Sequence, residues 1–252
     1  MKRWALAAVG LFALGAAAPA DAADLPLYGK APVVAPVLAF DWTGVYAGIN
    51  GGGGLAHSCW SITAAGGVAI DPPVGEGCHN ASGGTVGAQL GYRWQKGHWV
   101  LGAEAEGNWA DFKGNNVSLI VPPINNRTKI DSFGLFTGQL GYTVNGLLFY
   151  GKTGAAVAHA KYDEFIPGVG VVSNNLTQTR WGYSAGFGVE YAFAENWSVG
   201  GEYDHLFLGH HGGDLASPSL LPPVRTEKFG QDVDIGLIRV SYRWGGPVVA
   251  KY

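Results

Sequence analysis

RWGYSAGFGVEYAF, residues 180–193, changes polarity at almost every position, and this alternation decides the fold class. One face carries Trp181, Tyr183, Ala185, Phe187, Val189, Tyr191 and Phe193, and the other carries Gly182, Ser184, Gly186, Gly188 and Glu190. A period of two is typical of a β-strand, whose successive side chains point to opposite sides of a sheet. Because the second face is small and polar and the first is rich in aromatics, we expect the apolar face to contact lipid.

The composition agrees with an outer surface that does not face water. Glycine accounts for 41 of the 252 residues and tryptophan for nine, while only 14% of the residues are charged. A formal charge of −3 argues against nucleic-acid binding, which needs a basic surface. The same balance is unusual for a water-soluble enzyme.

The alternation recurs along the chain, and it predicts eight strands: 42–55, 84–94, 98–112, 130–144, 147–162, 180–193, 197–208 and 229–244. The gaps between them are of two kinds. Short breaks occur at 95–97, 145–146 and 194–196, and long polar stretches occur at 56–83, 113–129, 163–179 and 209–228. Asn145-Gly146 is a strong signal for a two-residue hairpin turn. Short turns at one end and long loops at the other predict an all-β, eight-stranded antiparallel transmembrane up-and-down β-barrel.

The first residues are interpreted as a targeting segment. A short basic region, an apolar run and a small-residue cleavage site ending at Ala22 predict a secretory signal peptide over residues 1–22. Residues 23–40 are rich in proline and are predicted to form a periplasmic linker, which leaves 41–252 for the barrel. The expected location is the bacterial cell outer membrane.

The polar face of each strand is predicted to point into the barrel. Eight strands enclose an interior that side chains just fill, so charges placed there must pair. The predicted network of lumen charges consists of Arg93, Glu104, Glu106, Lys152, Glu190, Glu202 and Asp204. Inward glycines are expected to leave some space, which keeps a narrow water-filled passage open as an alternative to a plug. A solvated surface face is the other interpretation of these charges.

Two segments do not fit the alternation. In 229–244, Asp232 and Asp234 share a face with apolar residues further along, so either they lie beyond the membrane or a β-bulge shifts the register. In the fourth strand, Phe133 and Leu135 fall on the inward face, for which we expect a similar register change.

The two cysteines, Cys59 and Cys78, are predicted to form a disulfide that closes a loop, as expected for an exported protein. The alternative is a metal site, because His57 and His79 flank the pair. Zinc sites usually have closer cysteine spacing, which favours the disulfide.

No motif predicts an enzyme. His205 with Asp204 is a candidate for catalysis, but a nucleophile motif such as G-x-S-x-G is missing. His210 and His211 are weak candidates for binding a metal or haem. We therefore expect no catalytic residues and no cofactor.

Three segments carry a family resemblance: WTGVYAGINGG at 42–52, YGKTGAAVA at 150–158 and VSYRWGGPVVAKY at 240–252. They resemble the small porin-like outer-membrane proteins of alphaproteobacteria, which include the immunogenic outer-membrane proteins and share an OmpA-like barrel. The resemblance covers essentially the whole chain after the signal peptide. The family's terminal aromatic is ambiguous here between Trp244 and Tyr252.

The resemblance implies a structural, porin-like barrel with surface-exposed loops, which passes small solutes at most. The alternative is a surface protein that binds haem or a host or phage partner. Expected partners are outer-membrane lipid and lipopolysaccharide, and the barrel-assembly machinery. No nucleic acid is expected.

Overall fold

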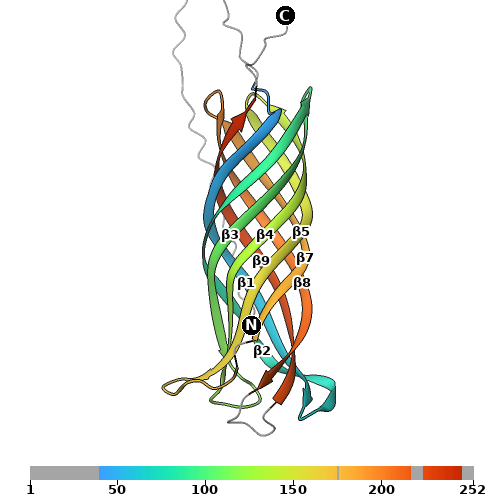
Figure 1. Ribbon diagram of the computed structural model, residues 1–252, viewed down its shortest axis with the longest axis vertical. Coiled ribbons are helices and arrows are strands. Elements are labelled where there is room, and N and C mark those ends of the chain that lie inside the picture. The colour runs from blue at the N-terminus through green and yellow to red at the C-terminus, as the bar shows by residue number, and fades with distance from the viewer. Residues whose placement is uncertain (1–39, 175, 217–223, 246–252) are drawn as a thin grey trace, which may run out of the picture. The chain divides into compact units, whose positions relative to one another are not determined.

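The computed structural model of the protein describes residues 40–174, 176–216 and 224–245. These residues form one antiparallel sheet that closes into a barrel (Figure 1). Its strands are β1 (Gly44–Ala65), β2 (Val68–Lys96), β3 (Trp99–Val117), β4 (Asn125–Val144), β5 (Leu147–Ile166), β6 (Gly170–Val171), β7 (Leu176–Ala192), β8 (Trp197–Ala216) and β9 (Val224–Trp244). The ring order is β4-β3-β2-β1-β9-β8-β7-β5, closed by pairing of β4 with β5. The predicted eight-stranded barrel is confirmed, because β6 is only a two-residue strand beside the end of β5.

Several predictions fall outside the described residues. These are the signal peptide at 1–22, nearly all of the linker at 23–40, and the chain end at Tyr252. β9 ends at Trp244, the other candidate for the terminal aromatic. None of the described residues lies in a helix long and apolar enough to cross a membrane.

Tight turns join the strands at the upper end of the barrel in Figure 1. The turn between β4 and β5 has a positive φ at both central residues, 50° at Asn145 and 80° at Gly146. This is the requirement of a type I′ turn, whose twist matches that of the flanking strands, so the predicted hairpin is confirmed.

The predicted long loops are mostly strand, and here the predicted boundaries are wrong. β1 continues to Ala65 and β2 begins at Val68, so only Gly66 and Gly67 separate strands that were expected to be 28 residues apart. The extensions are stable because they bury a further set of side chains inside the barrel, including Trp60 and Leu215. Their glycine-, proline- and asparagine-rich composition had suggested loops.

The outer surface has a band of apolar side chains. Near the tight turns the exposed aromatic residues include Trp94, Trp99, Tyr142, Trp197 and Trp244. Toward the long hairpins the band ends at ion pairs among Asp111, Lys113, Lys129, Asp131 and Lys161. Between these limits the outward positions are largely apolar, among them Ile49, Leu90 and Phe187. An apolar band with an aromatic girdle is what a lipid-facing barrel wall requires.

The unusual aspartates of β9 are explained without a bulge in that strand. Exposed and buried positions alternate without interruption along β9, so Asp232 and Asp234 lie on the outer face. Asp234 Oδ1 accepts hydrogen bonds from Tyr203 Oη at 2.5 Å and pairs with His205 Nδ1 at 2.6 Å. Partners on the neighbouring strand β8 therefore satisfy this outward carboxylate.

Candidate functional site

Inward side chains fill the barrel in three layers, and their order can be followed along β9. From the tight-turn end, the buried inward residues are first Arg243, Ser241 and Arg239, then Leu237, Ile235 and Val233, and then Gln231. Of these three layers, the charged one lies on the tight-turn side, an apolar layer lies in the middle, and a second polar layer lies toward the long hairpins.

Lys152 of β5 is the centre of the charged layer. Its Nζ lies 2.6 Å from Glu202 Oε1, 3.1 Å from Asp204 Oδ2, 3.4 Å from Glu106 Oε2 and 3.8 Å from Glu104 Oε1. These carboxylates come from β3 and β8, which lie two strands away from β5 on opposite sides. One buried ammonium group therefore joins both sides of the ring.

Two arginines complete the charged layer. Arg93 of β2 donates from Nη2 to Glu190 Oε2 of β7 at 2.9 Å, which links strands that are not neighbours. Arg239 of β9 pairs with Glu104 and, at 2.5 Å, with Glu202 Oε2. The seven residues proposed from the sequence thus lie together, and with Arg239 the layer holds five carboxylates and three cations.

Sequence reasoning missed three members of this layer. Arg239 is one of them. It directly follows the outward Ile238, so the alternation alone would have placed its side chain inside the barrel. The others are two tyrosines: Tyr46 Oη donates to Glu104 Oε2 at 2.7 Å, and Tyr150 Oη donates to Glu202 at 2.5 Å. Alternation places Tyr46 on the inward face, but a tyrosine gives no clear signal that it joins a charged layer, because the same side chain also suits an outward girdle.

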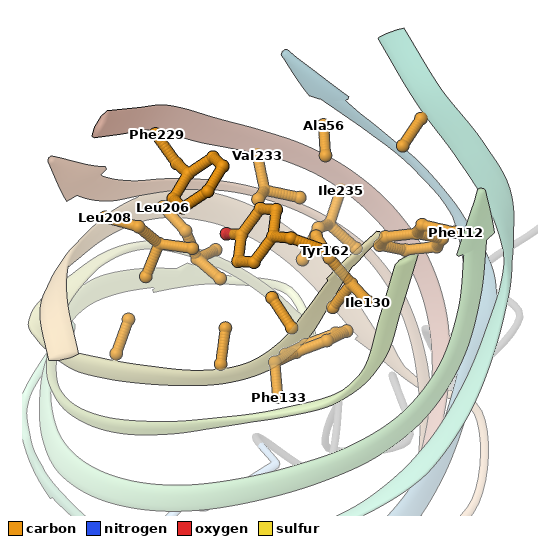
Figure 2. Packing of buried hydrophobic residues seen from close by; sticks show 14 of the residues in the cluster. Ala56, Phe112, Ile130, Phe133, Tyr162, Leu206, Leu208, Phe229, Val233 and Ile235 are labelled. Atoms are coloured by element: carbon orange, nitrogen blue, oxygen red, sulfur yellow. The ribbon is translucent and has the colours of Figure 1, made fainter. Parts of the chain in front are cut away.

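Buried apolar side chains form a layer in the middle of the barrel. Figure 2 shows its larger side chains pointing into the ring from several strands. They include Phe112, Ile130, Phe133, Leu206, Leu208, Val233 and Ile235, all buried. Leu135 belongs to the same cluster. β4 does have a register shift, between Ile130 and Ser132, but Phe133 and Leu135 still point inward, because the lumen has an apolar section. Such a layer offers a passing ion no polar ligand.

The second polar layer is organised by two further arginines. Arg180 donates to Tyr162 Oη at 2.7 Å, to Gln231 Oε1 at 2.8 Å and to the Phe229 carbonyl at 2.6 Å. Beyond it, Arg225 pairs with Glu76 and Glu164. Burial, together with neighbouring Glu76, raises the pKa of the nearby Glu227 to about 9.

The inward glycines do not leave the lumen open. A Cβ on Gly91 would lie 2.6 Å from Cζ of Tyr46, and a Cβ on Gly188 would lie 2.5 Å from Cζ of Tyr150. These glycines therefore accommodate the rings of residues on neighbouring strands. At these two positions, tyrosine side chains of neighbouring strands occupy the space that the inward glycines were expected to leave.

The cysteine and histidine candidates have defined positions. Cys59 and Cys78 form a disulfide between directly paired residues of β1 and β2, so the bond joins two strands instead of closing a loop. His57 and His79 have asparagine partners, Asn80 and Asn116 respectively, each at 2.8 Å. The metal alternative for this group therefore loses its sulfur ligands.

The other histidines lie on β8. Asp204 is inside the barrel whereas His205 is on the outer face, so the His205–Asp204 pair considered for catalysis does not form. His210 packs over Gly230, while His211 Nδ1 lies 3.3 Å from Arg180 Nη2. Burial and that guanidinium lower the pKa of His211, and the positive charge opposes a metal ion there.

Comparison with known proteins agrees with this architecture. Residues 5–221 match the family model described as outer membrane protein beta-barrel domain. The chain is 34% identical over 194 residues to the 31 kDa outer-membrane immunogenic protein of Brucella melitensis, covering 71% of this chain and 77% of that protein. It is 30% identical over 129 residues to a 22 kDa outer membrane protein of Rhizobium leguminosarum, covering 51% and 54%.

Among solved structures, the outer membrane protein OprG of Pseudomonas aeruginosa is similar in fold. The TM-score is 0.54 at 14% sequence identity, over 83% of this chain and 99% of OprG.

Proposed function

The chain belongs to the outer membrane protein β-barrel family, and from that premise we propose that it is a closed-lumen barrel with a structural role. It anchors in the outer membrane through its apolar band, in contact with lipid and lipopolysaccharide. It presents its long hairpins at the cell surface. Residues 1–22 serve as the signal peptide and 23–40 as the periplasmic linker in this proposal.

The filled lumen is the observation that supports a structural role over an open pore. An ion moving along the axis would meet the charged layer around Lys152, then the apolar layer that includes Leu135, and then the layer around Arg180. Each layer would have to rearrange at the same time for passage. Eight-stranded barrels have interiors that side chains can fill completely, so closure is the expected state.

Ion conductance in planar bilayers tests this proposal. We expect a flat current trace for the wild-type barrel and also for a Glu104→Gln/Glu106→Gln variant, because the apolar layer remains intact in both. A large open porin in the same bilayer serves as the positive control. Stepwise ionic currents from the folded wild-type protein would contradict a closed lumen.

Partner recognition is part of the proposal at two places. Trp244 ends β9 and is, within the part of the chain that the structure describes, the candidate aromatic residue for recognition by the barrel-assembly machinery. The surface hairpins are the candidates for host or phage contacts. Binding of haem by His210 and His211 is not proposed, because the guanidinium of Arg180 already contacts His211.

A further inference from the structure

Three glutamates from distant parts of the chain meet inside the extracellular end of the barrel. Glu76 of β2, Glu164 of β5 and Glu227 of β9 each have a carboxylate oxygen within 4.8 Å of the other two. All three side chains are fully buried. Two oxygens bound to one Ca²⁺ at 2.3–2.6 Å lie at most about 5 Å apart, so a single ion can reach all three carboxylates.

The charges of this cluster do not balance. Arg225 is the only cation paired with it among the described residues: Nη1 lies 3.2 Å from Glu76 Oε1, and Nη2 pairs with Glu164. The distance from Nη2 to Glu227 Oε1 is 3.6 Å, too long for a hydrogen bond. With all three carboxylates ionised, the cluster and its one guanidinium carry a formal charge of −2. Such a charge is costly in a buried site, and the raised pKa of Glu227 has the same cause, burial beside Glu76.

Several buried oxygens at this site have no hydrogen-bond partner among the described residues. Both carboxylate oxygens of Glu227 are in this state, and so is the Oδ1 of Asn126. Asn126 of β4 is fully buried, and its amide reaches the cluster, with Nδ2 3.4 Å from Glu76 Oε2. The two ends of an amide are assigned from hydrogen bonding, and a half-turn would direct Oδ1 at the glutamates as a fourth oxygen.

The charged layer nearer the tight turns provides a contrast within the same protein. Glu104, Glu106 and Glu202 also approach one another within 4.8 Å. There Lys152 lies between the carboxylates and Arg239 binds two of them, so protein cations occupy the space that an ion would need. At Glu227 the only protein cation paired with it among the described residues is Arg225, whose Nη2 lies 3.6 Å from Oε1, and no lysine lies among the three carboxylates.

We propose that Glu76, Glu164 and Glu227, together with the side-chain oxygen of Asn126, bind one divalent cation inside the extracellular end of the barrel. Carboxylate and amide oxygens without nitrogen or sulfur ligands favour Ca²⁺ over transition metals. The ligands come from β2, β4, β5 and β9, so the ion ties together strands from around the ring. Two positive charges neutralise the formal charge of −2.

Calorimetric titration of CaCl₂ into the folded, chelator-treated protein in detergent tests the proposal. We expect one Ca²⁺ per chain with a dissociation constant no weaker than about 1 mM, the range of extracellular calcium modules. Glu227→Gln keeps the shape of the side chain and removes one ligand charge, so it should weaken binding by at least about tenfold. Retained heat-modifiable migration on a gel establishes that the variant is folded.

Asp214→Asn is the matched control, because it removes a carboxylate at the same height on β8 but from an exposed side chain. It should bind Ca²⁺ like the wild-type protein. A second measurement needs no variant: Ca²⁺ should raise the temperature at which the wild-type barrel loses its folded gel mobility. Absence of saturable binding by the wild-type protein would overturn the proposal, as would equal affinity in Glu227→Gln. In that case, protons bound to the glutamates would neutralise the negative charge of the cluster in place of a cation.

Discussion

Lys152 is the residue on which the charged layer depends most. Four carboxylates lie within 4 Å of its ammonium group, and all of these side chains are buried. Two of them, Glu106 and Asp204, contact no other cation among the ion pairs of the described residues. Removing the ammonium would leave these carboxylates close together without a counter-charge.

Lys152→Met is therefore expected to lower the free energy of unfolding by about 3–5 kcal/mol, the usual cost of removing one partner from a buried ion pair. Lys113→Met is the control, because Lys113 pairs with Asp111 on the exposed surface and its loss should cost at most about 1 kcal/mol. Urea unfolding of both variants in lipid vesicles measures the difference. Similar stability of the two variants would show that the charged layer does not hold the barrel together.

At the scale of the strands, the sequence predicted more of the membrane-facing part than of the extensions. Alternation from Trp181 to Phe193 needs only a lipid face and a polar interior, and both are local properties of the sequence. The extensions of β1 and β2 depend on inward contacts such as Trp60 with Phe229, which are 169 positions apart and form only when the ring closes. Alternation placed Leu135 on the inward face, but a register change was expected there, because a polar interior was assumed throughout.

The disulfide belongs to these extensions. Cys59 and Cys78 are directly paired in the ladder of β1 and β2, beyond the apolar band. By the chain-entropy model, a bond closing a loop of this size contributes about 3 kcal/mol. The backbone ladder already holds the membrane-facing half of the same hairpin, so the bond should matter mainly for the outer half.

Reduction of the disulfide is expected to speed amide hydrogen exchange in 57–65 and 68–79, while exchange in 45–54 and 85–96 stays slow. The Cys59→Ser/Cys78→Ser variant should show the same pattern without reductant. Mass-spectrometric hydrogen exchange on the refolded barrel measures both. Equal acceleration along the whole hairpin would mean that the bond stabilises the entire barrel and would contradict a local role.

At the scale of the whole molecule, the outer face of the wall and the interior of the barrel have different environments and different compositions. The outer face meets lipid with an apolar band, and the interior is filled by two polar layers on either side of an apolar one. Pairing across the ring, as between Arg93 and Glu190, joins strands that share no backbone hydrogen bonds. In the proposed function the barrel is therefore a closed cylinder whose contents hold it together, and its hairpins are available for contacts outside the membrane.

The most direct test of this closed lumen is the reactivity of a thiol placed inside it. Ala156 is fully buried in the apolar layer, so the thiol of Ala156→Cys should not react with a water-soluble maleimide until the barrel is unfolded, while the native cysteines stay oxidised. The exposed Ser82→Cys should react at once in the folded protein and serves as the control. Labelling of Ala156→Cys in the folded barrel at a rate close to that of Ser82→Cys would contradict the sealed interior.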